Sequence, residues 1–352
     1  MKRSGFVWLS LSTTLLALGV VMLGAYVRLS DAGLGCPDWP GCYGSLQVPA
    51  TEVAIEGANA AFPQRPVDAA KAWKEMLHRY FAGTLGLVIL GLTIWAWYRR
   101  RIPGQLVAIP MLLSVLVLFQ ALLGMWTVTL LVKPAVVTAH LLGGVSIVAL
   151  AWWLTLRQGR FFDRRSRAAT AHLLPWAWFG VILLFAQISL GGWTSSNYAA
   201  LGCTEFPTCY DGQWLPPVDF NQAFVLWRGL GINYEYGVLD SAARTAIHIT
   251  HRLGALFVTI YIGLLGWKIA RYTGPSPQRN VAFALVLVLT LQLGLGIANV
   301  LGHLPLPVAI AHNGGAVLLL LVLLTLVHLL TPVGRLSETA LNLSVDPSKE
   351  VS

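Results

Sequence analysis

Two short polar clusters, each at the start of a long apolar run, contain the residues best suited to chemistry. The first is Glu75-Met-Leu-His78-Arg79, which precedes the apolar run 80–98. The second is His248-Ile-Thr-His251-Arg252, which opens another apolar run far downstream. Ionisable side chains are costly to place in a membrane helix, and where they occur they usually serve a function. Each cluster is therefore a candidate functional site.

Four histidines form a repeated set along the chain. His78 and His140 are followed, about 170 residues later, by His251 and His312. Two imidazoles at similar depth on different helices can ligate a haem iron from its two faces. A lone membrane histidine more often makes a hydrogen bond between helices, but the repeated pairing favours haem ligation. Zinc is the weaker interpretation, because two histidines in each half leave too few ligands.

Glu75 distinguishes the two clusters, because His248 occupies its place in the second one. Glu75 precedes His78 by three residues, so on a continuous helix both side chains share a face. A carboxylate there can accept a proton or stabilise developing positive charge. The alternative is an acid in the first helical turn, where the helix dipole favours it. We favour the functional interpretation for Glu75 and leave the role of His248 open.

Arg79 and Arg252 each follow one of these histidines directly. A guanidinium binds carboxylates bidentately, so both arginines are candidate contacts for haem propionates. Small residues near the histidines would let a flat macrocycle approach the helices. These small residues are Gly83, Gly86, Gly143, Gly144, Gly314 and Gly315.

The four cysteines form two pairs with identical spacing, Cys36 with Cys42 and Cys203 with Cys209. Both pairs lie in long polar connections and predict local disulfides in an oxidising compartment. Such a bond can simply staple its loop, or it can exchange electrons with a thiol partner. A Cys-x-x-Cys-His motif is absent from the sequence, so covalent haem attachment is not implied.

The composition identifies the elements that must position these residues. Of the 352 residues, 56% are hydrophobic and 11% are charged, whereas soluble domains carry about 25% charged residues. Long apolar runs of this kind form helices, since only helices satisfy their backbone polar groups internally. The net charge of +9 comes from Lys and Arg clustered in short connections, as in membrane proteins. We predict an all-α integral membrane protein in a lipid bilayer, with no nucleic-acid partner.

Eight apolar stretches each approach the roughly 20 residues that cross a bilayer. They span approximately 6–28, 77–98, 106–128, 136–157, 173–194, 247–269, 280–301 and 308–330. The basic connections 99–101 and 157–167 fall on the same side as Lys2 and Arg3, which the positive-inside rule assigns to the cytoplasm. Both termini and the tail 336–352 are then cytoplasmic, and the loops 29–76 and 195–246 face outward.

The two halves of the chain are related in sequence. Leu34-Gly-Cys36 matches Leu201-Gly-Cys203, and Gln120 with Gly124 matches Gln292 with Gly296. With four spans each, the halves keep the same orientation, as parallel repeats do. We predict two pseudo-symmetric four-helix bundles, 1–160 and 161–335, and bundles of this kind hold cofactors between facing helices. The glutamines Gln120, Gln187 and Gln292 are predicted to bond between helices.

The combined motifs resemble the haem A synthase family across essentially the whole chain. They are Gly24-Ala-Tyr-Val-Arg28-Leu-Ser, Gly33-Leu-Gly-Cys36-Pro-Asp-Trp-Pro40, Glu75-Met-Leu-His78-Arg79, Thr138-Ala-His140, Ile247-His-Ile-Thr-His251-Arg252 and Ala311-His312. The resemblance implies an oxidoreductase that converts the C8 methyl of haem O to a formyl group, making haem A. Successive hydroxylations would take their oxygen from water, and haem O synthase would supply the substrate.

The resemblance also assigns roles to residues. It implies that His251 and His312 are the axial ligands of a resident haem b, and that His78 and His140 are the ligands of the substrate haem. Glu75 matches the functionally important acid of the family, and Cys36 and Cys42 match a loop pair proposed to take part in redox chemistry. The implied location is the bacterial inner membrane. The electron acceptor and the oligomeric state, including a homo-oligomer, stay open.

Two alternatives use the same residues differently. A di-haem b membrane cytochrome would use the four histidines for electron transfer, with Glu75 as a proton relay. However, all four ligands near one face do not suit a wire across the membrane. A transporter built from parallel repeats would need broken helices and a polar site at the midplane. The centres of the predicted spans are poor in polar groups apart from the three glutamines.

Overall fold

The computed structural model describes residues 2–159, 161 and 171–332, and within them the chain forms helices joined by loops. The long helices are α1 (Lys2–Leu29), α3 (Ala69–Tyr98), α4 (Ala108–Thr129), α5 (Pro134–Gln158), α6 (Leu174–Ser196), α8 (Ser241–Tyr272), α9 (Pro277–Leu301) and α10 (Leu306–Leu330). The short ones are α2 (Glu52–Ala61), the 3-10 helix η1 (Ala171–Leu173) and α7 (Phe220–Ala223). All eight long helices are long and apolar enough to cross a membrane. The prediction of an all-helical protein with eight spans is confirmed.

The helices α3 and α8 begin earlier than the apolar runs within them. The predicted starts were 77 and 247, whereas the helices start at Ala69 and Ser241. The carboxylates of Asp68 and Asp240 accept hydrogen bonds from the backbone N–H of Lys71 and Ala243, which caps both helices. A hydropathy pattern does not register such polar first turns. Glu75 therefore lies beyond the first turn of α3, and the alternative of a first-turn acid is wrong.

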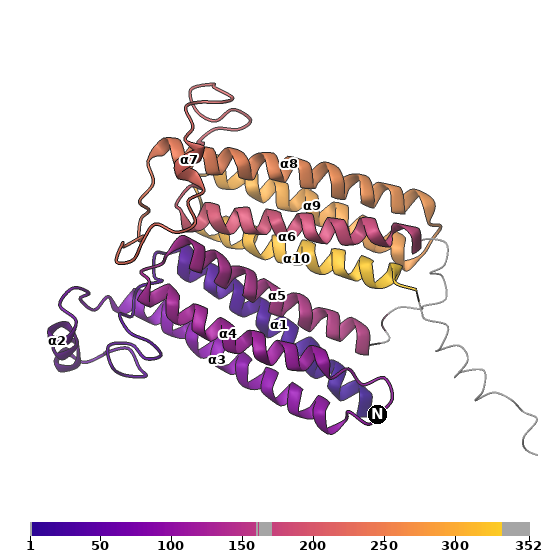
Figure 1. The fold of residues 1–352 in the computed structure, drawn as a ribbon, viewed down its shortest axis with the longest axis horizontal. Coiled ribbons are helices and arrows are strands. Elements are labelled where there is room, and N and C mark those ends of the chain that lie inside the picture. Colours follow the sequence, from indigo (N-terminus) through magenta and orange to yellow (C-terminus); the bar gives the residue numbers. More distant parts are fainter. Residues whose placement is uncertain (1, 160, 162–170, 333–352) are drawn as a thin grey trace, which may run out of the picture.

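The long helices lie side by side in two groups (Figure 1). One group contains α1, α3, α4 and α5, and the other contains α6, α8, α9 and α10. Between the groups, α5 contacts α6 and α10, and α1 contacts α10. The connections 30–68 and 197–240 lie at one end of the helices, which we call the long-loop end. The predicted tail 336–352 and most of the arginine-rich connection 157–167 fall outside the described residues.

Helix α10 is the most enclosed of the eight. Within the protein, 67% of its most apolar window is buried, against at most 33% for any other long helix. The outward faces of the others carry large apolar side chains such as Leu87, Leu118 and Leu287. Lipid chains solvate such faces as well as a protein core does. The exposed apolar faces therefore fit a multi-pass membrane protein.

Polar contacts join the two groups near both ends of α5. At one end, the Trp152 indole N–H lies 3.1 Å from the Leu321 carbonyl and 2.9 Å from the Thr325 hydroxyl oxygen. At the long-loop end, the hydroxyls of Thr138 and Ser196 are 3.2 Å apart. Each net hydrogen bond is worth about 1 kcal/mol. These contacts hold the groups in one relative position.

Candidate functional site

The structure brings His78 of α3 and His140 of α5 together. Their ring centroids are 6.4 Å apart, and the ring planes are inclined at 79°. Two imidazoles bonded at about 2 Å to opposite sides of one metal ion place their ring centres about 6 Å apart. The Nδ1 atoms of both rings are buried and have no hydrogen-bond partner. This pair is therefore suited to holding one metal centre between two helices.

His251 of α8 and His312 of α10 form the corresponding pair in the other group. His312 is close enough to His251 to act on it electrostatically. The Nδ1 atom of His312 is likewise buried and unpartnered. Over the residues described here, no three His, Cys, Asp or Glu side chains converge as a metal cluster would require. A group bound at either pair would rely on two imidazoles and its own remaining ligands.

A glycine on a neighbouring helix lies against each of the four imidazoles. A Cβ at Gly24 would stand 2.9 Å from Cε1 of His78, and a Cβ at Gly191 would stand 3.3 Å from Cε1 of His251. Gly124 and Gly296 lie against His140 and His312 in the same way, at 3.5 and 3.1 Å. These glycines let each imidazole pack closely on the neighbouring backbone. A larger residue at any of these positions would push the imidazole away from the neighbouring helix.

The three glutamines bond between helices, as predicted. The amide N–H groups of Gln120, Gln187 and Gln292 donate to the backbone carbonyls of His140, His251 and His312, at 2.8, 3.0 and 2.9 Å. The oxygens of these amides pack on Gly143, Gly254 and Gly315. Gly143 and Gly315 were expected to admit a macrocycle. Their open faces instead receive the glutamine side chains.

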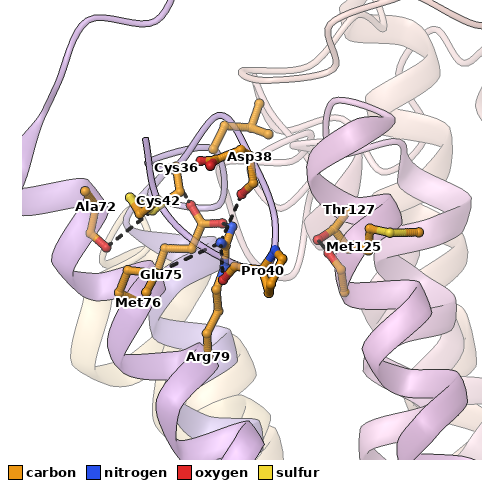
Figure 2. Close-up of polar contacts among 12 residues, drawn as sticks. Cys36, Asp38, Pro40, Cys42, Ala72, Glu75, Met76, Arg79, Met125 and Thr127 are labelled. Atoms are coloured by element: carbon orange, nitrogen blue, oxygen red, sulfur yellow. Dashed lines mark hydrogen bonds and ion pairs between the residues drawn. A yellow bond between two sulfur atoms is a disulfide. The ribbon is translucent and has the colours of Figure 1, made fainter. Parts of the chain in front are cut away.

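Glu75 lies at the long-loop end of α3 and is only 5% exposed. Its Oε2 accepts a hydrogen bond of 2.9 Å from the backbone N–H of Cys36, and its Oε1 lies 2.5 Å from Nη2 of Arg79. Figure 2 shows both side chains pointing from α3 towards the loop that follows α1. A buried carboxylate needs such partners, because an unpaired buried charge is costly.

Arg79 connects the carboxylate to the disulfide loop. Its Nη1 donates to the backbone carbonyls of Asp38 and Pro40, at 3.0 and 3.2 Å, and also to that of Gly41. The loop itself is closed by a Cys36–Cys42 disulfide (Figure 2). The guanidinium donors of Arg79 are thus directed at the loop and at Glu75. Contact with a propionate stays a prediction for this arginine.

The second half repeats these contacts with one different acceptor. The backbone N–H of Cys203 lies 3.0 Å from Nδ1 of His248, and Nε of Arg252 lies 3.1 Å from its Nε2. Arg252 also donates to the backbone carbonyls of Glu205 and Thr208, at 2.6 and 2.9 Å. The loop is closed by a Cys203–Cys209 disulfide. His248, whose role the sequence left open, therefore anchors this loop to α8.

Each disulfide loop contains one acid that stabilises its turn. Asp38 accepts from the backbone N–H groups of Tyr43 and Gly44, at 2.6 and 2.7 Å. Glu205 accepts from the hydroxyl of Thr208 at 2.8 Å and from the N–H of Gly212 at 3.2 Å. These donors, the Thr208 hydroxyl first, hold the pKa of Glu205 below its ordinary value of 4.5.

The sequence motifs gave no role to Gly24 or Gly191 and did not predict the contact of Gln187 with Gly254. One signal could have found Gly191 and the Gln187 contact, because a glutamine followed four residues later by glycine occurs at 120, 187 and 292, whereas Val20 stands four residues before Gly24. Each of these segments faces one of the histidines in the structure. The contacts made by Arg79 had no such signal, since a long side chain can reach many acceptors.

A family model described as cytochrome oxidase assembly protein, COX15-CtaA, matches residues 7–324. The haem A synthase of Shewanella oneidensis is 45% identical over 92% of this chain and 96% of its own length. The chain belongs to the COX15-CtaA family. More distant haem A synthases are those of Methylobacterium radiotolerans, 29% identical over 89% of this chain and 86% of the relative, and Halalkalibacterium halodurans, 26% identical over 74% and 76%.

The matched range of this COX15-CtaA chain includes every candidate site residue. The four histidines, Glu75 and both disulfide loops fall between residues 7 and 324. The family match therefore concerns the whole arrangement rather than one of its halves.

Proposed function

We propose that this chain is a haem A synthase that oxidises the C8 methyl of haem O to a formyl group. The supporting observation is two similar histidine pairs, of which only one has a carboxylate three residues before a histidine. The identity of 45% to a haem A synthase supports the same conclusion. Overall, the methyl group and one water give the formyl group, four protons and four electrons.

The two pairs take different haems in this proposal. His78 and His140 bind the substrate haem O and release haem A, while His251 and His312 bind a resident haem b. The separation of the His78 and His140 rings fits a group held between two imidazoles. Bound haem b would supply reversible one-electron storage at its iron.

In this proposal, Glu75 is the proton acceptor in the substrate half. Three residues before His78, it shares a face of α3 with that ligand. Its carboxylate can accept protons released from the methyl group or from water, or stabilise positive charge. Arg79 and the Cys36 N–H hold the carboxylate in place until it acts. Arg79 and Arg252 remain candidate contacts for the propionates at the edges of the two haems.

The proposed setting is the bacterial inner membrane, with both termini in the cytoplasm. The long-loop end then faces outward, where the two disulfides would be stable. Haem O synthase would supply the substrate. The parallel repeat would place residues 1–160 and 161–335 as two pseudo-symmetric bundles, so that haem-to-haem electron transfer needs only a short path between neighbouring pairs.

The di-haem b cytochrome finds no support in the comparisons, since the three relatives named above carry the synthase name. The test is haem extraction and chromatography of the protein purified after co-expression with a source of haem O. We expect haem b together with haem O and haem A. Haem b alone, at two per chain, would support the cytochrome, and the absence of haem would overturn the ligand assignment.

Two variants assign the pockets. His251→Ala is expected to lose haem b, and His78→Ala is expected to keep haem b while losing haem O and haem A. The opposite pattern would exchange the roles of the two halves. Full haem retention in both variants would refute the histidine ligation on which the proposal depends.

A further inference from the structure

Three of the four histidines have the same support from a neighbouring helix. In each case a glutamine donates to the backbone carbonyl of the histidine. Its amide oxygen packs on a glycine three residues after that histidine, at a site where a Cβ would stand 2.2 to 2.3 Å away. The pairs are Gln120 with Gly143, Gln187 with Gly254, and Gln292 with Gly315. We call each pair a glutamine brace.

The fourth histidine, His78, has no such brace. The residue four positions before Gly24, equivalent to Gln187, is Val20. The residue three positions after His78, equivalent to Gly254, is Phe81. Both members of the brace are thus replaced together. The imidazole of His78 packs on the backbone of Gly24, where a Cβ would stand 2.9 Å from its Cε1.

Two braces also reach an imidazole: the Gln292 amide nitrogen lies 3.4 Å from Nε2 of His312, and the contact on His251 is shorter. The Gln187 amide nitrogen lies 3.0 Å from Nδ1 of His251 as well as 3.0 Å from its carbonyl oxygen. The same amide nitrogen that donates to the carbonyl of His251 thus also lies at the edge of its ring, and the role of Nδ1 in this contact depends on the tautomer of the ring. A hydrogen bond to the second nitrogen of a ligating histidine fixes the orientation of the ring and tunes its basicity.

We propose that Gln187 is a positioning residue that makes the His251 pocket retain its haem, and that the Val20–Phe81 replacement makes the His78 pocket the exchangeable one. This inference rests on the proposed function, in which one haem is resident and the other is substrate. A resident haem benefits from a ligand held in one orientation. A substrate must leave, and His78 has no glutamine on the neighbouring helix to hold its backbone carbonyl in place.

Simple helix packing would account for a glutamine between two helices, but it predicts no effect on a bound haem. Helix packing alone and positioning of His251 by Gln187 therefore predict different effects on the rate of haem release and on the reduction potential. Removing a partner of a metal-binding histidine typically weakens metal affinity by about 10- to 100-fold. We therefore expect Gln187→Val to release haem b about 10-fold faster or more, measured by transfer from the purified full-length protein to apomyoglobin.

The matched control is Gln120→Val, which removes a brace from His140 in the other half. It is expected to leave haem b release from the His251 pocket within twofold of wild type. Gln187→Glu places a carboxylate oxygen, a strong acceptor, beside Nδ1 in place of the amide nitrogen, so it should retain haem b and lower its midpoint potential, because a more basic ligand favours the oxidised iron. Unchanged release and an unchanged potential in both Gln187 variants would overturn the proposal.

The reciprocal experiment installs a brace in the substrate half. The double variant V20Q/F81G is made in a His251→Ala background and loaded with haem b as the probe. Release from the remaining pocket should be about 10-fold slower than in His251→Ala alone. Unchanged or faster release from a monodisperse sample would contradict the assignment of Val20 and Phe81.

The ligand assignment of His251 and the role of Gln187 can be refuted separately. If His251→Ala alone retains all of its haem b, the ligand assignment of the proposed function is wrong. If His251→Ala loses haem b while Gln187→Val releases it at the wild-type rate, the ligand assignment stands and the role of Gln187 is refuted.

Discussion

At the long-loop end, Glu75 on α3 and His248 on α8 occupy equivalent places and contact equivalent groups. Each faces the backbone N–H of the first cysteine of its disulfide loop, at 2.9 and 3.0 Å. Each also contacts the arginine four residues later on its own helix, at 2.5 and 3.1 Å. The scaffold is therefore the same in both halves, and the acceptor differs.

Comparing Glu75 with His248 distinguishes two roles of the acceptor, which are anchoring the loop and carrying a negative charge. A carboxylate has two oxygens and can accept from both donors, whereas a neutral imidazole has one accepting nitrogen and can satisfy only one donor at a time. The second loop nevertheless adopts the same closed form around its disulfide. Anchoring a disulfide loop therefore does not require a negative charge. The charge of Glu75 needs another explanation, and a role in proton transfer supplies one.

The largest expected effect comes from removing that charge. Glu75→Gln keeps an oxygen for the Cys36 N–H but cannot take up a proton, so haem A formation should fall by about 10²- to 10⁴-fold. Haem b content should be unchanged, as measured by extraction and chromatography. His248→Gln is the matched control and should alter haem A yield by less than twofold. A normal yield from Glu75→Gln would remove this residue from the mechanism.

Replacing the two arginines should lower the free energy of unfolding by different amounts. Arg79→Ala leaves the buried Glu75 carboxylate without its charged partner, which costs about 3–5 kcal/mol in buried pairs. Arg252→Ala removes hydrogen bonds to two loop carbonyls and to a neutral imidazole, at about 1 kcal/mol each. SDS-induced unfolding of the two variants compares these costs. An equal loss of unfolding free energy would show that the Glu75–Arg79 pair gains little from its charges.

Removing either disulfide should cost the same free energy of unfolding, but only one removal should change haem A yield. Each closes a loop with a sequence separation of 6, and chain entropy gives about 2 kcal/mol for such a loop. The double variants C36S/C42S and C203S/C209S should lower the free energy of unfolding equally. Only the first should also reduce haem A yield, because Cys36 positions Glu75. Equal losses of yield would assign both loops a purely structural role.

The smallest effect should be an acid-induced loosening of the second loop. Because hydrogen bonds lower the pKa of Glu205 in the folded loop, its stabilising effect is present above the ordinary pKa and is lost as the pH falls through the lowered value. Hydrogen exchange of the 203–213 segment, corrected for intrinsic pH dependence, should therefore increase in that acidic range. Glu205→Gln should remove the transition, and a transition that persists in this variant would implicate another group.

The sequence predicted the spans and the paired histidines because both follow from residue type and spacing. Apolar runs determine the eight helices, and the cysteine spacing predicts both disulfides. The hydropathy of the sequence did not predict the polar first turns of α3 and α8, which the capping carboxylates of Asp68 and Asp240 stabilise. The partners of Arg79 were also missed, because they are backbone carbonyls of a loop whose path depends on the tertiary structure.

The helices α1, α5, α6 and α10 connect two histidine pairs that are encoded separately within one chain. In a symmetric dimer of a single four-helix unit, every substitution would appear at both pairs at once. A covalent repeat removes that constraint, so one copy can acquire Glu75 or lose a glutamine brace while the other copy stays unchanged. The different roles proposed for the two sites can therefore evolve independently in this chain, one residue at a time, which a homodimer does not allow.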